Sequence, residues 1–220
     1  MDNTILLNFI NRSNDNGDSH VVIFQENMAE SFRPQATVWK VIREVEPNDN
    51  FYFEYSPQFE ISMGSSMMGG MPKMTVAEPG LAYEVVDHIS GQELRVSEKR
   101  WVGNPNHIEI HNEHPNGVFD ANCYRNGSLL ATKKSLMNNG VAAFHFPQVL
   151  NFNVVSEMED IDDVAEGEAV GSYYLLTAST QIPLGYITSA DIVMTGGGSG
   201  PDAEPFQFTL ENAKFKNIEL

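Results

Sequence analysis

The sequence predicts a mostly β protein, an antiparallel β-sandwich or flattened barrel with irregular loops. Apolar and polar residues alternate with period two along most segments, as they do in strands that bury one face. Turn-forming residues recur about every 8–15 residues, and no long stretch shows the 3.6-residue period of an amphipathic helix. Hydrophobic residues make up 41% of the 220-residue chain, which is enough to form a sizeable core.

Five segments in the first half of the chain are predicted to be strands. Residues 36–45 are ambiguous because their apolar residues also fit one face of a helix, but their β-branched content favours a strand. Residues 51–63 contain Pro57, which predicts an edge strand or a bend. The predicted strands span 4–11, 20–25, 36–45, 51–63 and 81–89.

The clearest local signal lies in the second half of the chain. Asn126-Gly127 separates two alternating runs, and Asn-Gly is the preferred pair for a two-residue turn with positive φ at both positions. We therefore predict a hairpin of 118–125 against 128–134. Further predicted strands span 141–150, 152–158, 172–178, 185–195 and 206–218, and the Gly-rich segment 195–205 is expected to join the last two strands.

The chain is predicted to form a single β-sandwich domain over residues 1–220. No internal repeat and no change of composition marks a domain boundary. The predicted core draws on large apolar side chains from most of the strands, namely Trp39, Phe51, Phe53, Tyr83, Val85, Phe144, Phe146, Ile192 and Phe208.

The charge of the chain argues against two classes of partner. Thirty acidic residues against thirteen basic ones give a formal net charge of −17. Such a chain repels phosphate backbones and anionic bilayers, so we expect neither nucleic acid nor an anionic membrane as a partner. The same charge favours solubility and leaves divalent cations or basic proteins open as partners.

The predicted compartment is the cytoplasm. Cys123 is the one cysteine, so the chain forms no intramolecular disulfide and no cysteine-based zinc site. The N-terminal residues carry an acid where a signal peptide needs basic charge, and no stretch reaches the roughly 20 apolar residues of a membrane-spanning helix. Release by a route that needs no cleaved signal stays open.

Several stretches together resemble a family of small, soluble, β-rich bacterial proteins. The stretches are NFINRSNDNGDSHVVIFQENM, ATVWKVIREVEPNDNFYFEYSPQFEISM, ANCYRNGSLLATKKS and SADIVMTGGGSGPDAEPFQFTLEN. Some members of that family carry the label aromatic ring-opening dioxygenase, and rhizosphere-expressed proteins are more distantly similar. The resemblance implies a β-rich fold and brings no established activity. The chain departs from the family pattern at 63–74 and at 107–114.

The segment 63–74 holds half of the chain's ten methionines and is a candidate interaction loop. Thioether sulfur is a soft ligand that could bind Cu(I), and methionine also makes adaptable contact surfaces. A plain surface loop is the third interpretation. The residues concerned are Met63, Met67, Met68, Met71 and Met74.

The segment 107–117 is the candidate metal site. In a strand, residues two apart share a face, so His107, Glu109 and His111 are expected to point the same way while the isoleucines between them enter the core. Adding His114 from the following turn could give the histidine–carboxylate set of a non-haem iron or zinc site. The alternative is a hydrated strand face with no metal.

The favoured function is that of a non-enzymatic binding or self-associating protein, either a homo-oligomer or one with a protein partner. No cofactor is expected, although a divalent metal stays open. The alternative is a metal-dependent enzyme that uses the 107–114 segment, with iron or zinc. The third interpretation is a membrane-active β-sandwich that inserts apolar loops into lipid.

Overall fold

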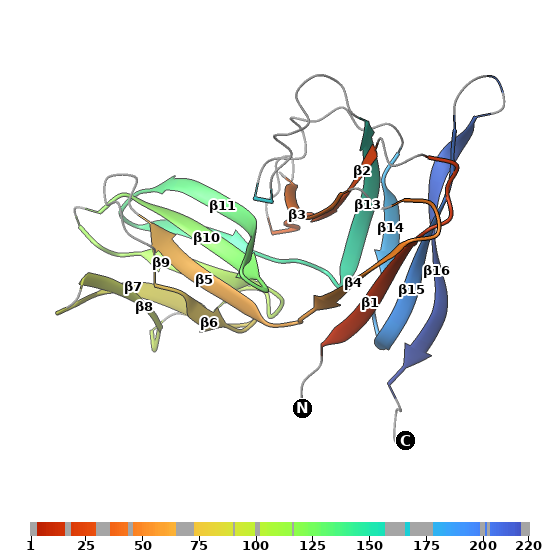
Figure 1. Cartoon of the computed structure of the whole chain (residues 1–220). Coiled ribbons are helices and arrows are strands. Elements are labelled where there is room, and N and C mark those ends of the chain that lie inside the picture. The colour runs from red at the N-terminus through yellow and green to blue at the C-terminus, as the bar shows by residue number, and fades with distance from the viewer. Residues whose placement is uncertain are drawn as a thin grey trace. The chain divides into compact units, whose positions relative to one another are not determined.

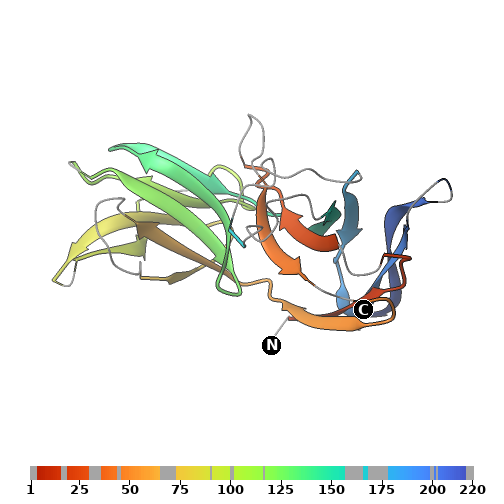
Figure 2. The same ribbon diagram turned by 45° about the horizontal axis from the view of Figure 1, so that its top comes forward.

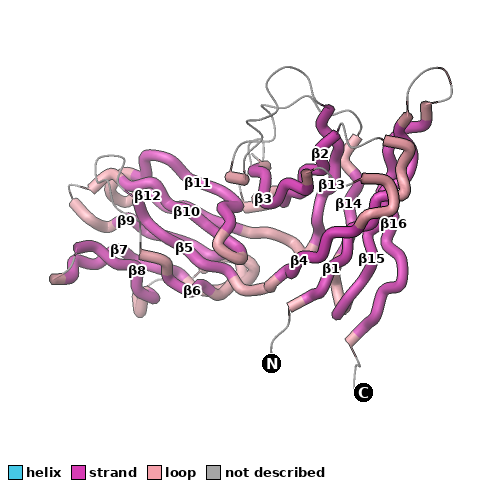
Figure 3. The backbone as a smooth tube through the Cα atoms, viewed as in Figure 1, coloured by secondary structure: helices cyan, strands magenta, loops and turns pink. Residues whose placement is uncertain are grey.

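The described part of the chain consists mostly of β-strands (Figure 1). The structure, a computed structural model, describes residues 4–15, 19–29, 36–43, 46–64, 73–89, 91–99, 102–115, 117–156, 166–167, 178–198, 201 and 203–216. These residues contain sixteen strands and no helix, as the colouring in Figure 3 shows. Within these ranges nothing helical is therefore long and apolar enough to cross a bilayer. The mostly β fold class is confirmed.

The strands gather in two compact units. Unit 1 comprises Met1–Gln25, Thr37–Pro57 and Gln148–Leu220, and unit 2 comprises Glu26–Ala36 and Gln58–Pro147. The chain thus passes into unit 2 after Pro57 and returns to unit 1 after Pro147. Unit 1 is built from the two ends of the chain, whereas the strands of unit 2 are consecutive.

Unit 1 contains two four-stranded sheets. Its strands span Ile5–Asn11 (β1), Ser19–Gln25 (β2), Thr37–Ile42 (β3), Asn50–Tyr55 (β4), Val149–Ser156 (β13), Thr180–Pro183 (β14), Ile187–Gly197 (β15) and Glu204–Phe215 (β16). The sheet orders are β16-β15-β1-β4 and β14-β13-β2-β3. β1 is parallel to β15, and the other neighbouring pairs are antiparallel.

Aromatic contacts join the two sheets of unit 1 face to face. The ring of Phe152 on β13 lies 5.4 Å from that of Phe208 on β16, centroid to centroid. Trp39 on β3 packs edge-on against Tyr55 on β4 at 5.9 Å. All four side chains are buried, so the core of unit 1 lies between these sheets.

Unit 2 also contains two four-stranded sheets (Figure 2). Its strands span Phe59–Gly64 (β5), Thr75–Ala77 (β6), Ala82–His88 (β7), Gly91–Val96 (β8), Ile108–Asn112 (β9), Phe119–Arg125 (β10), Ser128–Leu136 (β11) and Gly140–Phe144 (β12). The sheet orders are β11-β10-β5-β6 and β12-β9-β7-β8, with β7 parallel to β9. Fully buried side chains from both sheets form its core: Ile61, Cys123, Leu130, Ile108, Ile110 and Ala142.

Most of the predicted strands are present, and their local signals explain why. The predicted hairpin is confirmed, because Asn126 and Gly127 adopt φ of 51° and 76° between β10 and β11. The ambiguous segment 36–45 forms the strand β3, and the predicted strand 51–63 bends at Pro57 to give β4 and β5. The predicted strand 172–178 lies outside the described residues.

Four sequence predictions need correction. The segment 141–150 is not one strand: β12 ends and β13 begins on either side of Pro147, which cannot donate to a sheet. The strands β8 and β14 were not predicted. The sheets are not wholly antiparallel, since each unit contains one parallel pair. Phe51, predicted to be packed, is 38% exposed, because it is the second residue of β4 and the first three residues of that strand are exposed. The other eight predicted core residues are buried.

The two units have the same strand-pairing diagram. For the comparison, the strands of each unit are numbered from first to eighth. In unit 2 the order is β5 to β12, and in unit 1 it is β13, β14, β15, β16, β1, β2, β3, β4. In each unit the first strand pairs with the second and sixth, and the sixth pairs with the seventh. The third strand pairs with the fourth and, in parallel, with the fifth, which pairs with the eighth. Unit 1 is thus a circular permutation of unit 2.

The registers of the two units agree as well. In unit 1 Phe152 pairs with Ile23 and Thr180, and at the equivalent place in unit 2 Ile61 pairs with Cys123 and Thr75. Each unit has a bulge at the next position, between Ile23 and Phe24 in β2 and between Cys123 and Tyr124 in β10. The residues that the bulges displace, Trp39 and Leu130, are both fully buried.

A buried asparagine ends the equivalent strands β1 and β9. The side-chain Oδ1 of Asn11 accepts the N–H of Ser13 at 2.9 Å, and that of Asn112 accepts the N–H of His114 at 3.0 Å. The carbonyls of these asparagines accept the N–H of Asn48 and Asn139, both at 2.6 Å. Asn48 and Asn139 have positive φ, which asparagine tolerates. The units therefore share one eight-stranded fold, a repeat that the sequence analysis missed.

The units differ in the connection equivalent to the Asn-Gly turn. β10 and β11 are joined by two residues, whereas β2 and β3 are joined by 26–36, a segment that belongs to unit 2. Asn27 anchors it there. Its Nδ2 donates to the carbonyl of Ala143 at 3.0 Å, and its Oδ1 accepts the N–H of His145 at 2.8 Å. The single domain predicted over 1–220 stays a prediction.

Replacing Asn112 by alanine is expected to destabilise the protein. Its Nδ2 donates to the carbonyls of Gly117 and Leu136, both at 2.8 Å, in addition to the bond from His114. The loss leaves buried backbone groups without partners, so the free energy of unfolding should fall by about 3 kcal/mol. Urea denaturation measures this, with Asn106→Ala, at an exposed turn position, as the control. Equal effects of the two substitutions would contradict the structural role of Asn112.

The fragment 58–147 is expected to fold alone, because it contains all eight strands of unit 2. Far-ultraviolet circular dichroism and cooperative urea unfolding test this. The matched control is the fragment 148–220, which contains four strands of unit 1 and should not unfold cooperatively. If 58–147 behaves like the control, the chain is one domain, as the sequence predicts.

Candidate functional site

The predicted histidine segment forms β9, at the centre of a sheet of unit 2. Ile108 and Ile110 are buried, and His107, Glu109 and His111 lie on the opposite face, as the period of two predicts. We call this face, with the residues that neighbour it on the adjacent strands, the polar sheet face. Its members on the neighbouring strands include Glu84 on β7, Glu93 and Arg95 on β8, and His145 just after β12.

His111 and Glu109 form a direct pair on the polar sheet face. The Nε2 of His111 lies 2.9 Å from the Oε2 of Glu109, and both side chains are largely buried. Glu84 on β7 is the register partner of His111 on β9. Its carboxylate accepts a hydrogen bond from the hydroxyl of Ser97 at 3.0 Å. Each carboxylate is therefore already engaged by a polar neighbour on the same face.

A second pair joins His107 to His145. β9 and β12 are antiparallel neighbours, with Ile108 opposite Phe144, so the next residues along each strand also face each other. The two imidazole rings lie 5.7 Å apart, centroid to centroid. Sequence reasoning missed this pair because cross-strand register joins residues that are far apart in the chain.

The environment of His145 favours its neutral form. Burial lowers the pKa of His145, and the nearby His107 lowers it further. The backbone of His145 is fixed on both sides, since its N–H donates to Asn27 and its carbonyl accepts the N–H of Met28. Two imidazoles held in this way could accept hydrogen bonds from a ligand or supply two nitrogen ligands to a metal ion.

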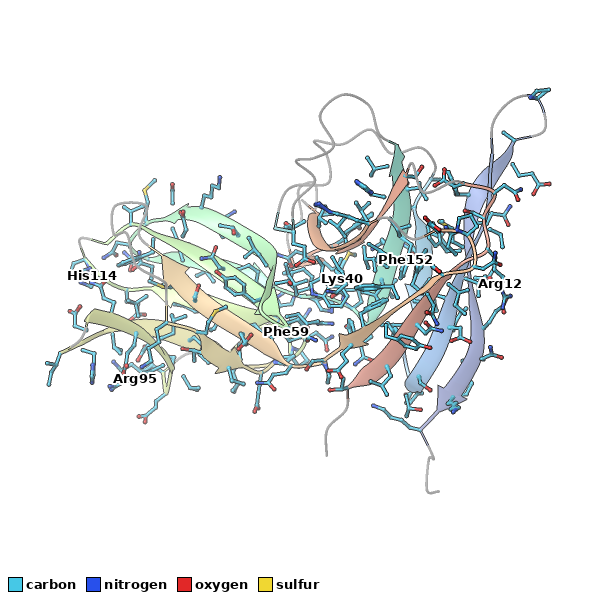
Figure 4. All side chains as sticks on the ribbon, viewed as in Figure 1. Arg12, Lys40, Phe59, Arg95, His114 and Phe152 are labelled. Carbon is cyan, nitrogen blue, oxygen red and sulfur yellow. The ribbon has the colours of Figure 1, made fainter. Side chains whose placement is uncertain are left out.

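His114, the fourth predicted ligand, lies apart from the polar sheet face. The chain leaves the strand after Asn112, and the Nε2 of His114 lies 3.4 Å from the Oδ1 of Asp87. Its ring packs edge-on against Phe119. Figure 4 labels His114 and Arg95 on unit 2. In the part of the chain that the structure describes, no three His, Cys, Asp or Glu side chains converge as metal ligands. The predicted four-ligand site stays a prediction.

The polar sheet face continues onto β8 through Glu93. Lys73 and Arg95 donate to its carboxylate at 2.9 and 2.7 Å, which lowers the pKa of Glu93 to about 2. Lys73 lies within the segment 63–74 that holds the predicted interaction loop. Of that loop's methionines, Met63 lies at the end of β5 and Met74 is partly exposed, whereas Met67, Met68 and Met71 lie outside the described residues.

Arg125 is a buried cation that the sequence did not single out. Its guanidinium lies 4.4 Å from the ring centroid of Phe59, and burial lowers its pKa to about 9. It stays charged at neutral pH. The equivalent residue in unit 1 is Gln25, also fully buried, so the end of this strand holds a polar side chain in both units.

Unit 1 offers a different kind of surface on the outer face of β1 and β4. Leu6 and Tyr52 are 56% and 71% exposed. Leu6 pairs with Glu54, and Tyr52 pairs with Asn8, so the two apolar side chains are diagonal neighbours on one face. β4 is the edge strand of its sheet. We call Leu6 and Tyr52 the outer apolar pair.

Stability should fall as the pH falls from about 7 to about 5. Because the pKa of His145 is lower in the folded protein, the unfolded chain binds that proton more readily, and stability is lost below the unfolded pKa of about 6.5. His107→Gln removes the repulsion and should flatten this loss. Urea denaturation at several pH values measures it, with the exposed His88→Gln as the control. Identical pH slopes for His107→Gln and wild type would contradict the coupling.

Comparison with known proteins brings no relative for this chain. No protein-family model, no curated protein sequence and no solved structure matches it. The family resemblance of the sequence motifs therefore stays an expectation. The polar sheet face and the outer apolar pair are the surfaces that bear on function.

Proposed function

We propose that the protein is a non-enzymatic, self-associating binding protein that acts through surface contact. The observation that carries this proposal is the outer apolar pair. A leucine and a tyrosine at 56% and 71% exposure lie together on one sheet face, beside an edge strand. Exposed apolar groups beside a strand that ends the described sheet favour contact with another protein surface.

The partner that fits the outer apolar pair is a second copy of this chain. Leu6 and Tyr52 offer apolar area that gains free energy when water is removed, and the edge strand β4 offers backbone groups that a strand can pair with. The net charge of −17 opposes this contact at long range. Association should therefore strengthen when salt screens the repulsion.

The remaining features agree with a binding role. On the polar sheet face the carboxylates of Glu84, Glu93 and Glu109 are held by neighbouring side chains of the same sheet or the adjoining loops. Cys123 is fully buried, and burial raises the pKa of its thiol, which keeps it from acting as a nucleophile. A cytoplasmic location agrees with the single cysteine, which leaves the chain without an intramolecular disulfide.

A metal-dependent enzyme is the second candidate. One observation favours it, namely that the imidazoles of His107 and His145 face each other at 5.7 Å. They would supply two nitrogen ligands, and Glu109 is the carboxylate next to His107 on the same face. The bond from Glu109 to His111 would have to be exchanged for the metal.

Replacing the outer apolar pair should weaken self-association. Leu6→Ser with Tyr52→Ser removes the apolar area, and the association constant should fall roughly tenfold or more. Light scattering at rising protein concentration, at low and high sodium chloride, measures this. The matched control is Val118→Ser with Met137→Ser, two exposed apolar residues of unit 2. A wild-type protein that stays monomeric at every concentration and salt would refute the proposed function.

A further inference from the structure

The two units form the same fold from different chain orders. Unit 2 uses β5 to β12 in sequence, whereas unit 1 needs β13–β16 from the C-terminal part and β1–β4 from the N-terminal part. Nothing covalent joins these halves except the chain of unit 2. The contacts that complete unit 1 are therefore available equally to β1–β4 of the same copy or of another copy.

Each half of unit 1 depends on the other. β1 pairs with β15 from Leu6 opposite Ser189 to Asn11 opposite Met194, and β2 pairs with β13 along six residues. The ring of Phe9 packs on Phe208 at 6.5 Å between centroids. A C-terminal half alone would leave β13 and β15 with open edges and would uncover the core beneath them. It must be completed by some copy of β1–β4.

The two crossings that flank the strands of unit 2 are short, whereas the segment 26–36, which also belongs to unit 2, lies within the N-terminal half and moves with it. Three residues, 56–58, connect β4 to β5, and four residues, 145–148, connect β12 to β13. Each crossing contains a proline, Pro57 and Pro147, which restricts its own φ and the conformation of the residue before it. Short hinge segments favour exchange of an element between copies.

We propose that β1–β4 of one copy complete unit 1 of a second copy, with 56–58 as the hinge. The proposal rests on the proposed self-association and names its partner, a second copy of this chain. In the exchanged assembly β13–β16 of one copy pair with β1–β4 of the other. Taken in that order, these eight strands correspond to β5–β12 of unit 2. Reciprocal exchange gives a closed dimer, and exchange in one direction gives an open chain of copies.

Exchange competes with closure inside one copy. A tethered half has an effective concentration on the order of 1 mM, so dilute chains close on themselves. The exchanged fraction should therefore rise with the chain concentration at which folding takes place. Below about 1 mM the rise should be roughly proportional to concentration.

A disulfide across β1 and β15 reports which copy supplies β1. Asn8 and Asp191 are register partners whose side chains are hydrogen-bonded at 3.0 Å, and neighbouring strands lie about 4.8 Å apart, within the range of a disulfide. The variant that carries Asn8→Cys and Asp191→Cys is unfolded and then refolded at about 10 µM and at about 300 µM. Both values lie below the effective concentration of the tethered half, and the protein is oxidised after refolding. Native Cys123 is fully buried and should not interfere. Non-reducing denaturing gels should show covalent dimers and higher species that increase roughly twentyfold at the higher concentration.

The matched control places the disulfide inside unit 2. Asn122 and Thr132 pair across the β10–β11 hairpin, with side chains bonded at 2.7 Å. Asn122→Cys with Thr132→Cys should cross-link within one copy at both concentrations. Intermolecular links of equal amount in this control and in the test variant would mean random oxidation and would overturn the proposal.

A circular permutant provides a second, cysteine-free test. Leu6 of β1 and Lys214 of β16 both pair with Ser189, so the ends of the two strands are about 10 Å apart and a short linker can join residue 220 to residue 1. New termini between Pro57 and Gln58 then make the eight strands of each unit consecutive. The permutant should fold and should lose the association that depends on folding concentration.

The outcomes separate this proposal from the proposed function. Two outcomes would overturn exchange and still support self-association. In the first, the protein associates by light scattering but the cross-links form only within single copies. In the second, the permutant associates as strongly as the parent. Absence of association in the parent overturns both. Association of the parent that rises with the folding concentration, together with a monomeric permutant, supports exchange even if the double-cysteine variant folds poorly.

Discussion

The pairing of the two ends of the chain is the constraint on which unit 1 depends. β1 lies between β15 and β4, and β2 lies between β13 and β3, so the N-terminal strands occupy central positions in both sheets. Central strands carry hydrogen bonds on both edges and cover the core, and no peripheral contact can replace them. Unit 2 has no such constraint because its eight strands are consecutive. The closure of unit 1 therefore decides whether this chain is complete by itself or is completed by another copy.

Local signals predicted the strands, but they could not predict their partners. The Asn126-Gly127 turn needs only the two φ angles that those residues favour, and Pro57 marks a bend by its own geometry. The pairing of β1 with β15 joins residues from opposite ends of the chain, and a period of two says nothing about such partners. The repeat was hidden for a related reason. Equivalent positions share a packing role, as Trp39 and Leu130 do, and keep the same residue only where backbone geometry demands it, as at Asn48 and Asn139.

The candidate site could be predicted from the sequence only as far as one strand reaches. Alternation placed Glu109 and His111 on one face, where they form a direct pair. It could not place His145 beside His107, because that contact depends on the register between β9 and β12. Alternation also says nothing about His114, which follows the end of the strand at Asn112 and lies beside Asp87. Side chains two apart on a strand are reliable neighbours, whereas a set that spans a strand end is not.

The shared fold shows how the two units divide their chemistry. The register of Leu7 against Phe53 matches that of Ile108 against Phe144, so Leu6, Asn8 and Ile10 of unit 1 are equivalent to His107, Glu109 and His111 of unit 2. The outer face of unit 1 thus carries the exposed Leu6 and Tyr52 among polar residues such as Asn8, whereas the equivalent positions of unit 2 are ionisable. Burying paired, charged groups costs hydration free energy, whereas burying Leu6 and Tyr52 gains it. Contact between copies is therefore favoured on the face of unit 1. On the polar sheet face of unit 2 the carboxylate of Glu109 is already engaged by His111, and this face offers less exposed apolar area to a second copy.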